Sequence, residues 1–591
     1  MRIHLTYLII FVCSMSTYAQ DKGDYNWLFG YDSGYVDFFG GSNINFDENQ
    51  PIFFKEDRTM NIDVTNASIS NKAGQLLMYT NGVFIANASH EVMENGDGLN
   101  PGGILGYDIT GLPIPQAALI LPLPRDSNRY YILHEGLITI PLQGSQGITI
   151  SGGPLRTSLV DMSFNNGLGK VIEKNTIAIN DTLDYGRLTA TKHANGQDWW
   201  ILLPQYNSNL IYRLLLTSEG VLNKEPLIVP DTIYTGFGQS TFSTDGSKFI
   251  HISLKEFGEN YLTIFDFDRC SGTLSNQQIY FYTEVDASAG VAVSPNARYL
   301  YLSSHKEIYQ FDLTADDIFA SKDTVAISDG YKEPILLENG DTIELVTRFF
   351  LAQLAPDGRI YLNTSNGVRS LHVINYPDRG GVACEVAQHS VKLPTYNRFS
   401  LPNFPNYRLG PIDGSPCDTL GVNNFPQAKY RYDLDTLEAL SFYFNDLSYY
   451  EPTAWHWDFG DGEMSEEVNP SHTFLDYGTY EVCLTVSNEY GSHTFCQTLD
   501  LSLTAFTERV VNSTLSVFPN PANDLLYLKM EETADFSGTW YLFNALGQVV
   551  KAYSMDASLV EVDLRDLGAG IYFYSFVEGG GVVDLGKLVV E

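Results

Sequence analysis

The sequence is poor in basic residues. Its 591 residues include 35 lysines and arginines against 71 aspartates and glutamates, which gives a formal net charge of −36. No run rich in Lys or Arg offsets this imbalance. Nucleic acids and anionic membrane surfaces attract basic proteins through their phosphates. The composition therefore argues against both as partners and indicates an acidic, solvated surface.

Long apolar runs are also missing, and no segment predicts a transmembrane helix, which needs about 20 apolar residues. At the N-terminus Arg2 precedes a short apolar stretch at 5–12, and small or polar residues lead to Ala19. This order is typical of a signal peptide, and we predict that residues 1–19 are removed. Cys13 follows a valine where a lipoprotein signal has a small residue, so acylation is not expected.

Sequence signatures of catalysis are absent too. There is no nucleophile elbow, no HExxH motif and no phosphate-binding glycine loop, and the 11 histidines are scattered singly. Acidic residues are so frequent that a pair of glycosidase-like carboxylates can be neither picked out nor excluded. We therefore predict no catalytic residue, no metal site and no cofactor from the sequence.

Cysteine is scarce, with six in the chain and five after signal cleavage. Cys483 and Cys496 lie in two strand-like runs, "YEVCLTVSN" and "SHTFCQTLDL", joined by "EYG". This arrangement predicts a cross-strand disulfide in an oxidising compartment. The pairing of Cys270, Cys384 and Cys417 stays open, and the odd count leaves at least one thiol unpaired or intermolecular.

Aromatic residues (13%) and glycines (50) are plentiful, which favours β-strands with tight turns. The turns "HANG", "STDG", "SPNA" and "APDG" are each followed by two alternating strands. From Asn195 to Asp245, Asn296 and Asp357 the steps are 50, 51 and 61 residues. This spacing predicts a β-propeller of six or seven blades over residues 24–408, with a last unit near "FSLPNFPNYRL" closing the ring. A large sandwich or a β-helix is the alternative, although the unit is too long for a β-helix coil.

Ligands of propellers bind where the loops of the inner strands converge on the central channel. The candidate ligand-binding residues on or near these strands are His193, Gln239, Gln353 and Asn403. The alternative interpretation is that they are polar groups lining a wet channel, because propellers serve many functions.

The segment from "WHWDFGDG" to "YEVCLTVSN" resembles a PKD domain, the immunoglobulin-like module named for polycystic kidney disease proteins, over residues 430–504. The residues that carry the motif are Trp457, Phe459, Gly460, Asp461, Gly462 and Tyr480. The resemblance implies a β-sandwich in which these residues are structural, with Tyr480 forming a tyrosine corner. Calcium could bind the acidic turn at 458–463, but a single turn lacks the six or more oxygens that the ion prefers.

The tail, residues 515–591, opens with "SVFPNPANDLLYL" and resembles the type A C-terminal sorting domain of the type IX secretion system of Bacteroidetes. The residues that match the family pattern are Pro519, Asn520, Pro521, Gly547, Gly570 and Lys587. The resemblance implies export by the type IX machinery to the medium or the cell surface. It also implies removal of the tail by a sortase-like peptidase, with the cut in a linker at 505–514.

A second, Pro/Gly-rich linker is predicted at 409–429. The expected protein is thus all-β, with a propeller, a PKD-like spacer and a sorting domain. Its expected function is non-enzymatic binding of an extracellular glycan or protein. The alternative is a propeller hydrolase or lyase acting on extracellular polysaccharide. Two carboxylates facing each other in a deep cleft would favour the enzyme, and an open aromatic-lined face would favour binding.

Overall fold

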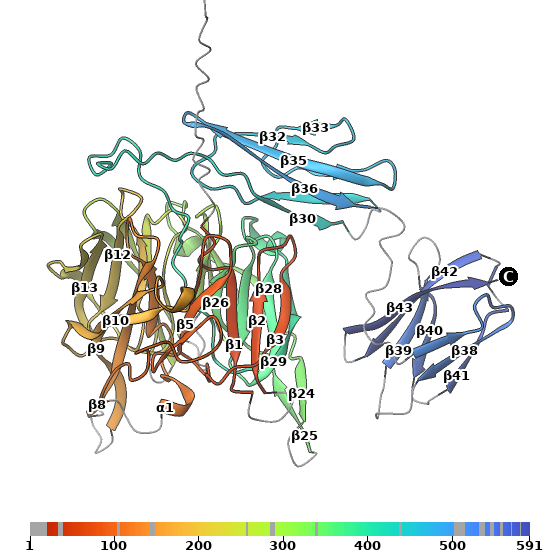
Figure 1. The fold of residues 1–591 in the computed structure, drawn as a ribbon, viewed down its shortest axis with the longest axis horizontal. Helices are drawn as coiled ribbons and strands as arrows, with labels where there is room; N and C mark the ends of the chain where they lie inside the picture. Colours follow the sequence, from red (N-terminus) through yellow and green to blue (C-terminus); the bar gives the residue numbers. More distant parts are fainter. Residues whose placement is uncertain are drawn as a thin grey trace, which may run out of the picture.

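The structure is a computed structural model. It describes residues 21–590 apart from 34–38, 103–106, 142–147, 256–257, 284–289, 337–340, 436–439, 502–514, 531–537, 544–548, 556–558, 566, 569 and 579–580. The predicted signal peptide, the linker at 505–514 and Gly547 therefore lie outside the described residues. The described chain is almost entirely β-structure and forms three regions (Figure 1). No helix in this part of the chain is long and apolar enough to span a membrane.

The first region contains seven antiparallel sheets, each formed by strands that follow one another in the sequence. Sheets one to three are β1 (Asn26–Gly30), β2 (Gly41–Asn45) and β3 (Ile52–Glu56); β4 (Ala67–Ser70), β5 (Leu76–Thr80) and β6 (Ile85–Asn87); and β7 (Ala118–Pro122), β8 (Arg129–Pro141), β9 (Ile148–Asp161) and β10 (Lys170–Ile179). The short helix α1 (Tyr107–Thr110) precedes β7.

The remaining four sheets have four or five strands each. They are β11 (Thr189–Lys192), β12 (Trp199–Pro204), β13 (Ser208–Thr217), β14 (Gly220–Asn223) and β15 (Leu227–Ile233); β16 (Ser240–Phe242), β17 (Lys248–Leu254), β18 (Glu259–Asp268) and β19 (Thr273–Thr283); β20 (Gly290–Val293), β21 (Tyr299–Ser303), β22 (Glu307–Asp312) and β23 (Asp323–Ile327); and β26 (Phe349–Leu354), β27 (Ile360–Thr364), β28 (Val368–Ile374) and β29 (Val386–Asn397). A separate hairpin, β24 (Lys332–Leu336) and β25 (Thr342–Val346), precedes the seventh sheet.

The first strands of these sheets surround a common axis. Neighbouring inner strands pack in the order β1, β4 and β7, then β11, β16, β20 and β26, and β29 packs against the first sheet and closes the ring. Strands such as β12 and β27 are buried along their whole length, because each sheet is covered by its neighbours on both faces. The region is a propeller with seven blades in the described chain, as the repeat spacing predicted.

The channel of the propeller is occupied by the chain itself. Residues 399–408, here called the channel segment, leave the seventh blade and hydrogen-bond to β27 of that blade and to the inner strand β7 of the third blade. Ser400 O accepts from Asn363 Nδ2 at 3.0 Å, and Tyr407 OH donates to Ile120 O at 2.8 Å. Leu401, Phe404 and Tyr407 are buried. The segment near "FSLPNFPNYRL" does close the ring, but as a plug without strand pairing.

The second region is a sandwich of two sheets. One contains β30 (Tyr430–Leu434), β31 (Ser441–Asp446) and β34 (Ser471–Thr473); the other contains β33 (Met464–Ser465), β32 (Ala454–Asp458), β35 (Thr479–Asn488) and β36 (Gly491–Asp500). Trp457 is fully buried between the sheets. Tyr480 OH donates to Asp476 O at 2.8 Å, which is the tyrosine corner expected from the sequence. Cys483 and Cys496 face each other across β35 and β36 and form the predicted disulfide.

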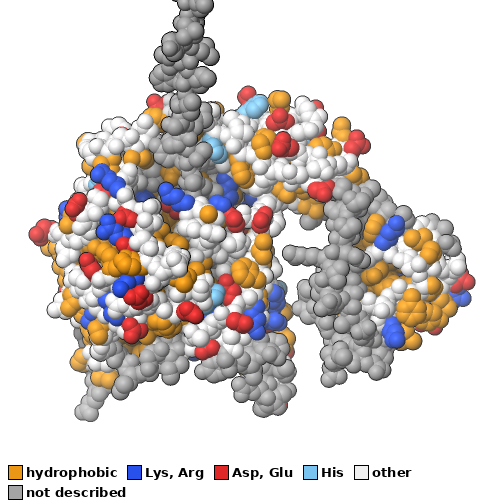
Figure 2. All heavy atoms as spheres, viewed as in Figure 1, with side chains coloured by type: hydrophobic (Ala, Val, Ile, Leu, Met, Phe, Trp, Pro, Cys, Tyr) orange, Lys and Arg blue, Asp and Glu red, His pale blue; other side chains and the backbone are white. Residues whose placement is uncertain are grey.

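This sandwich is fixed to one end of the propeller. Arg431, which is 3% exposed, donates to Asp357 O at 2.7 Å and Asn375 O at 2.6 Å, both in the seventh blade. Lys429 bonds to the hydroxyl of Tyr25 in the same junction. Figure 2 shows Lys and Arg side chains gathered where the two regions meet. A cation buried against backbone carbonyls holds its position, so the sandwich is a rigid cap on this end.

The third region is a small sandwich with a core of its own around Trp540, Leu526 and Phe576. Its sheets are β37 (Leu515–Phe518), β38 (Leu525–Met530) and β41 (Leu559–Asp563), and β40 (Val549–Met555), β39 (Gly538–Phe543), β42 (Gly570–Glu578) and β43 (Gly581–Val590). Asn520 donates to Lys587 O at 2.6 Å and accepts from Val589 N at 2.9 Å. The opening Pro-Asn-Pro turn is thereby attached to the last strand.

Candidate functional site

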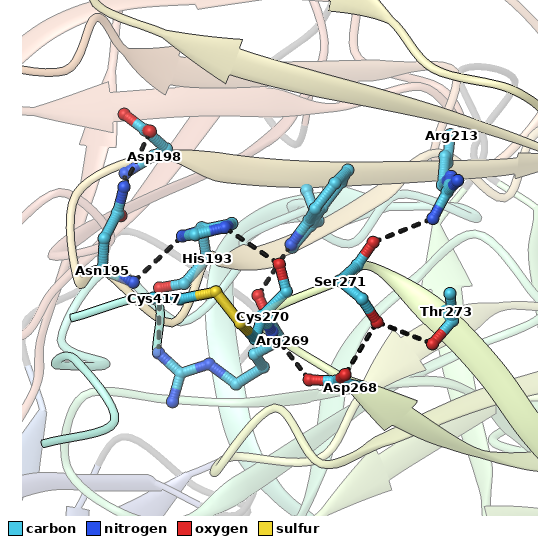
Figure 3. Close-up of a disulfide and its surroundings, with 11 residues drawn as sticks. His193, Asn195, Asp198, Arg213, Asp268, Arg269, Cys270, Ser271, Thr273 and Cys417 are labelled. Atoms are coloured by element: carbon cyan, nitrogen blue, oxygen red, sulfur yellow. Dashed lines mark hydrogen bonds between the residues drawn. A yellow bond between two sulfur atoms is a disulfide. The ribbon is translucent and has the colours of Figure 1, made fainter. Parts of the chain in front are cut away.

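The residue His193 lies outside the channel, at the turn between β11 and β12 on the end that carries the sandwich (Figure 3). Its Nε2 hydrogen-bonds Cys270 O at 3.1 Å, and its Nδ1 accepts from Asn195 N at 3.0 Å. Burial lowers the pKa of its imidazole. Both ring nitrogens are engaged by the protein, so His193 connects the fourth and fifth blades.

A second disulfide, which the sequence left open, joins Cys270 to Cys417 beside His193 (Figure 3). Cys417 belongs to the segment 409–429, predicted as a linker. That segment also bonds to the fourth blade through Ile412 N and Ala194 O at 2.9 Å. The connection between propeller and sandwich is thus covalently attached to the propeller. Cys384 is a buried free cysteine.

The other three predicted channel residues lie in or near the inner strands. Gln239 accepts from Val291 N at 3.1 Å and Ala352 N at 2.8 Å, which ties three blades together. Asn403 is part of the channel segment and donates to Ala118 O at 3.0 Å and Leu188 O at 2.9 Å. Gln353 Nε2 donates to its neighbour Leu354 O at 3.2 Å. The structure brings none of these side chains to a common site, and a ligand role for them stays a prediction.

A cluster with hydrolase-like chemistry lies inside the wall of the channel. Ser240 Oγ is 2.9 Å from His251 Nδ1, and His251 Nε2 is 3.5 Å from Asp184 Oδ2. Serine hydrolases use this order of groups. Here the exposed fractions are 0%, 1% and 0%, and burial keeps the pKa of His251 well below its usual value. A nucleophile must reach its substrate, so we interpret the cluster as structural.

An open cavity lies at the end of the channel opposite the sandwich, and we call it the mouth cavity. It has a volume of about 900 Å³. Loops that precede or follow the inner strands of several blades line it, together with α1 and the end of β25. These elements lie at the bottom of Figure 1, far from the second region.

Aromatic rings form one wall of the mouth cavity. Phe237 and Phe350 stack with centroids 5.4 Å apart, and Phe399 lies 5.5 Å from Phe350. Phe399 is also the first residue of the channel segment, so the plug forms the floor of the cavity. Aromatic rings in a concave site supply the apolar contact area that small ligands and sugars use.

Charged side chains also line the mouth cavity. Asp63 lies 3.5 Å from an Arg398 nitrogen and accepts from Tyr31 OH at 3.1 Å. Glu344 lies 3.5 Å from Lys332 Nζ. Both lining carboxylates are thus paired with a cation. Arg348 donates to His305 Nδ1 at 3.2 Å.

A smaller cavity of about 680 Å³ lies at the capped end, between the second, third and fourth blades. Lys192 lies 3.9 Å from the centroid of the Trp199 ring in its wall, and burial lowers the pKa of Lys192 to about 8. Lys192 Nζ also donates to Gln197 O at 3.3 Å. This cation is held by the protein on two sides, which favours a structural role.

No metal centre is evident in the part of the chain that the structure describes, where no three His, Cys, Asp or Glu side chains are grouped around one point. In the acidic turn of the second region, Asp461 lies 2.7 Å from His472 and Asp458 accepts from Gly460 N at 3.0 Å. Calcium binding at this turn stays untested.

Sequence reasoning missed the mouth cavity, because its loops carry no repeated motif. A weak signal exists in hindsight. In a chain with only 35 basic residues, Arg348 and Arg398 are each followed directly by phenylalanine. Both pairs lie at the border of a strand, where a loop begins or ends.

Comparisons with known proteins identify two of the three regions. Residues 426–503 match the family model described as PKD domain, and residues 516–591 match the one described as secretion system C-terminal sorting domain. The chain carries a PKD domain and a sorting domain. The sorting domain addresses the protein to the type IX secretion system, for release or display at the cell surface.

The PKD domain is similar to solved PKD domains of two Vibrio proteins. The PKD1 domain of the Vibrio cholerae metalloprotease PrtV is 30% identical, with a TM-score of 0.12, and the match covers 13% of this chain and 98% of that one. The PKD1 domain of Vibrio anguillarum Epp is 31% identical, with a TM-score of 0.13 and coverage of 14% and 96%.

The propeller is less similar to solved structures. A putative 6-phosphogluconolactonase from Bacteroides uniformis is 12% identical, with a TM-score of 0.35, and the match covers 63% of this chain and 98% of that one. No curated protein matches the chain. The propeller assignment therefore rests on the order and packing of the seven sheets.

Proposed function

We propose that this protein is a secreted or surface-displayed, non-enzymatic binding protein whose propeller takes an extracellular glycan in the mouth cavity. One observation carries the proposal. The cavity combines a wall of three phenylalanine rings with lining carboxylates that are already paired with cations. A glycosidase needs one protonated and one free carboxylate on either side of the bond that it cleaves.

The placement of the domains supports the same proposal. The PKD domain covers one end of the channel, and the channel segment fills its interior. The mouth cavity is larger than the cavity at the capped end, about 900 Å³ against about 680 Å³, and it lies on the side away from the PKD domain. A cargo that is exported as a folded protein meets its ligand outside the cell, where glycans of neighbouring cells and matrices are abundant.

The test uses the mature full-length protein on a glycan array, followed by affinity measurements on the best ligand. Phe399→Ala removes a ring from the cavity wall, and we expect it to weaken binding at least tenfold. Arg298→Ala is the control, because Arg298 lies at the turn before β21 with a half-exposed side chain. Equal affinity of both variants would contradict the proposal. Shortened glycan products would favour the hydrolase or lyase alternative, and binding of proteins alone would favour a protein ligand.

A further inference from the structure

Arg348 is a cation that lines the mouth cavity. Among the described residues it forms no ion pair, whereas Arg398 faces Asp63 and Lys332 faces Glu344. The chain has 71 acidic residues against 35 basic ones. Acidic residues are thus about twice as frequent as basic ones, yet no carboxylate in the described part of the chain pairs with this guanidinium.

The guanidinium is nevertheless held in place. Arg348 donates to His305 Nδ1 at 3.2 Å, and His305 Nε2 lies 2.8 Å from Ser365 Oγ. An imidazole nitrogen that accepts from arginine carries no proton, so the proton is on Nε2 and is donated to the serine hydroxyl. The chain Ser365–His305–Arg348 orients the guanidinium, and Arg348 lines the cavity.

We infer that the mouth cavity recognises an acidic sugar, a uronate or a sulfated residue, whose anionic group pairs with Arg348. This inference rests on the proposed glycan-binding function and adds the charge of the ligand. Guanidinium donors form a planar fork that matches carboxylate and sulfate oxygens, and such charge-assisted bonds are about twice as strong as neutral ones.

The aromatic wall favours a sugar over an acidic peptide. The rings of Phe237, Phe350 and Phe399 lie in one contiguous row, with centroids 5.4 and 5.5 Å apart. Phe350 is 3% exposed, whereas Phe237 and Phe399 are half-buried, so these two rings offer the apolar surface on which the C–H face of a pyranose packs. An acidic peptide would place flexible side chains there and would leave part of this surface uncovered.

The experiment compares ligands that differ in charge and little else. Hexagalacturonate and neutral hexagalactose differ at carbon 6, where one has a carboxylate and the other a hydroxymethyl group. We expect the mature full-length protein to bind hexagalacturonate or sulfated hexagalactose at least tenfold more tightly than hexagalactose. Arg348→Gln should remove this preference, and added salt should reduce it. Arg298→Gln, at the capped end, should retain it.

The outcomes separate the two proposals. Cavity-dependent binding of hexagalactose as tight as that of hexagalacturonate, unaffected by Arg348→Gln, overturns the acidic-sugar inference and leaves glycan binding intact. Loss of all glycan binding in the wild type overturns both. Hexaglutamate binding more tightly than the acidic sugars, with the same dependence on Arg348, overturns the assignment to a sugar. Thermal unfolding of both variants confirms that a loss of binding is not a loss of fold.

Discussion

The arginines at the two ends of the propeller channel differ in their burial and in their partners. At the capped end, Arg431 is 3% exposed and the Arg408 side chain 10% exposed, and they bind carbonyls or a carboxylate of the same chain. At the mouth end, Arg348 is only partly buried and faces an open cavity. Arg431 holds the PKD domain on the propeller, Arg408 pairs within the propeller, and Arg348 is the cation that we propose for the ligand. The PKD domain, predicted as a spacer, is fixed to this end of the propeller.

The largest effect is expected for the disulfide at the capped end. Cys270 and Cys417 are separated by 147 residues, and Cys483 and Cys496 by 13. Loop-closure entropy gives a stabilisation of about 5 kcal/mol for the longer loop and about 3 kcal/mol for the shorter one. Calorimetry on Cys270→Ser/Cys417→Ser and on Cys483→Ser/Cys496→Ser should show this order. A larger effect of the second pair would mean that the attachment at 409–429 adds little.

The next largest loss in the free energy of unfolding is expected for Arg408→Met. Arg408 and Asp24 are 10% and 5% exposed, and Nη2 lies 2.6 Å from Oδ2. Removing the cation leaves a buried carboxylate unpaired, which typically costs about 3–5 kcal/mol. Denaturant unfolding of the propeller measures the loss. Arg298→Ala breaks an exposed pair with Asp312 and should cost less than about 1 kcal/mol. Similar losses of stability in both variants would show that the Arg408–Asp24 ion pair does not stabilise the propeller.

A smaller effect on stability is expected when a buried histidine, His134, takes up a proton at low pH. His134 lies at neither end of the channel. Burial lowers the pKa of His134 in the third blade to about 3. An unfolded histidine titrates near 6.5, so the contribution of His134 is complete above that pH and is lost as the pH falls toward 3. Between pH 7 and pH 5 the free energy of unfolding should fall by about 2 kcal/mol more in the wild type than in His134→Gln. Parallel pH curves would show that the imidazole is accessible to protons in the fold.

The smallest effect on stability is expected at the mouth. Among the described residues, Arg348→Gln leaves no carboxylate without its cation, so the free energy of unfolding should change by less than about 0.5 kcal/mol. Denaturant unfolding under the conditions used for Arg408→Met allows direct comparison. A loss of about 3 kcal/mol would place Arg348 among the structural cations and would remove the distinction between the two ends.

The sequence predicted the fold well where the signal was periodic or local. The turns around Asn195, Asp245, Asn296 and Asp357 repeat with the length of a blade, and the blades are where this spacing put them. The hairpin of Cys483 and Cys496 is a contact between neighbours in sequence, so its disulfide was readable. The tyrosine corner of Tyr480 is likewise local.

The mouth cavity could not be predicted from the sequence, because it depends on contacts between residues that are far apart in the sequence. Arg348, His305 and Asp63 come from three loops, and nothing in their spacing shows that the ring brings them together. The role of residues 399–408 also escaped prediction. Two prolines and alternating apolar residues fit a strand edge as well as a plug, and only the closed ring decides between them.

Hydrogen–deuterium exchange on the full mature protein, with and without saturating hexagalacturonate, tests most directly where the ligand binds. The account predicts slower exchange in peptides that contain Thr347–Phe350 and Arg398–Ser400, which are the backbone at the mouth cavity. It predicts no change in the turn His193–Gly196 or in the PKD domain. Protection at that turn or in the PKD domain, with the mouth peptides unchanged, would contradict the account.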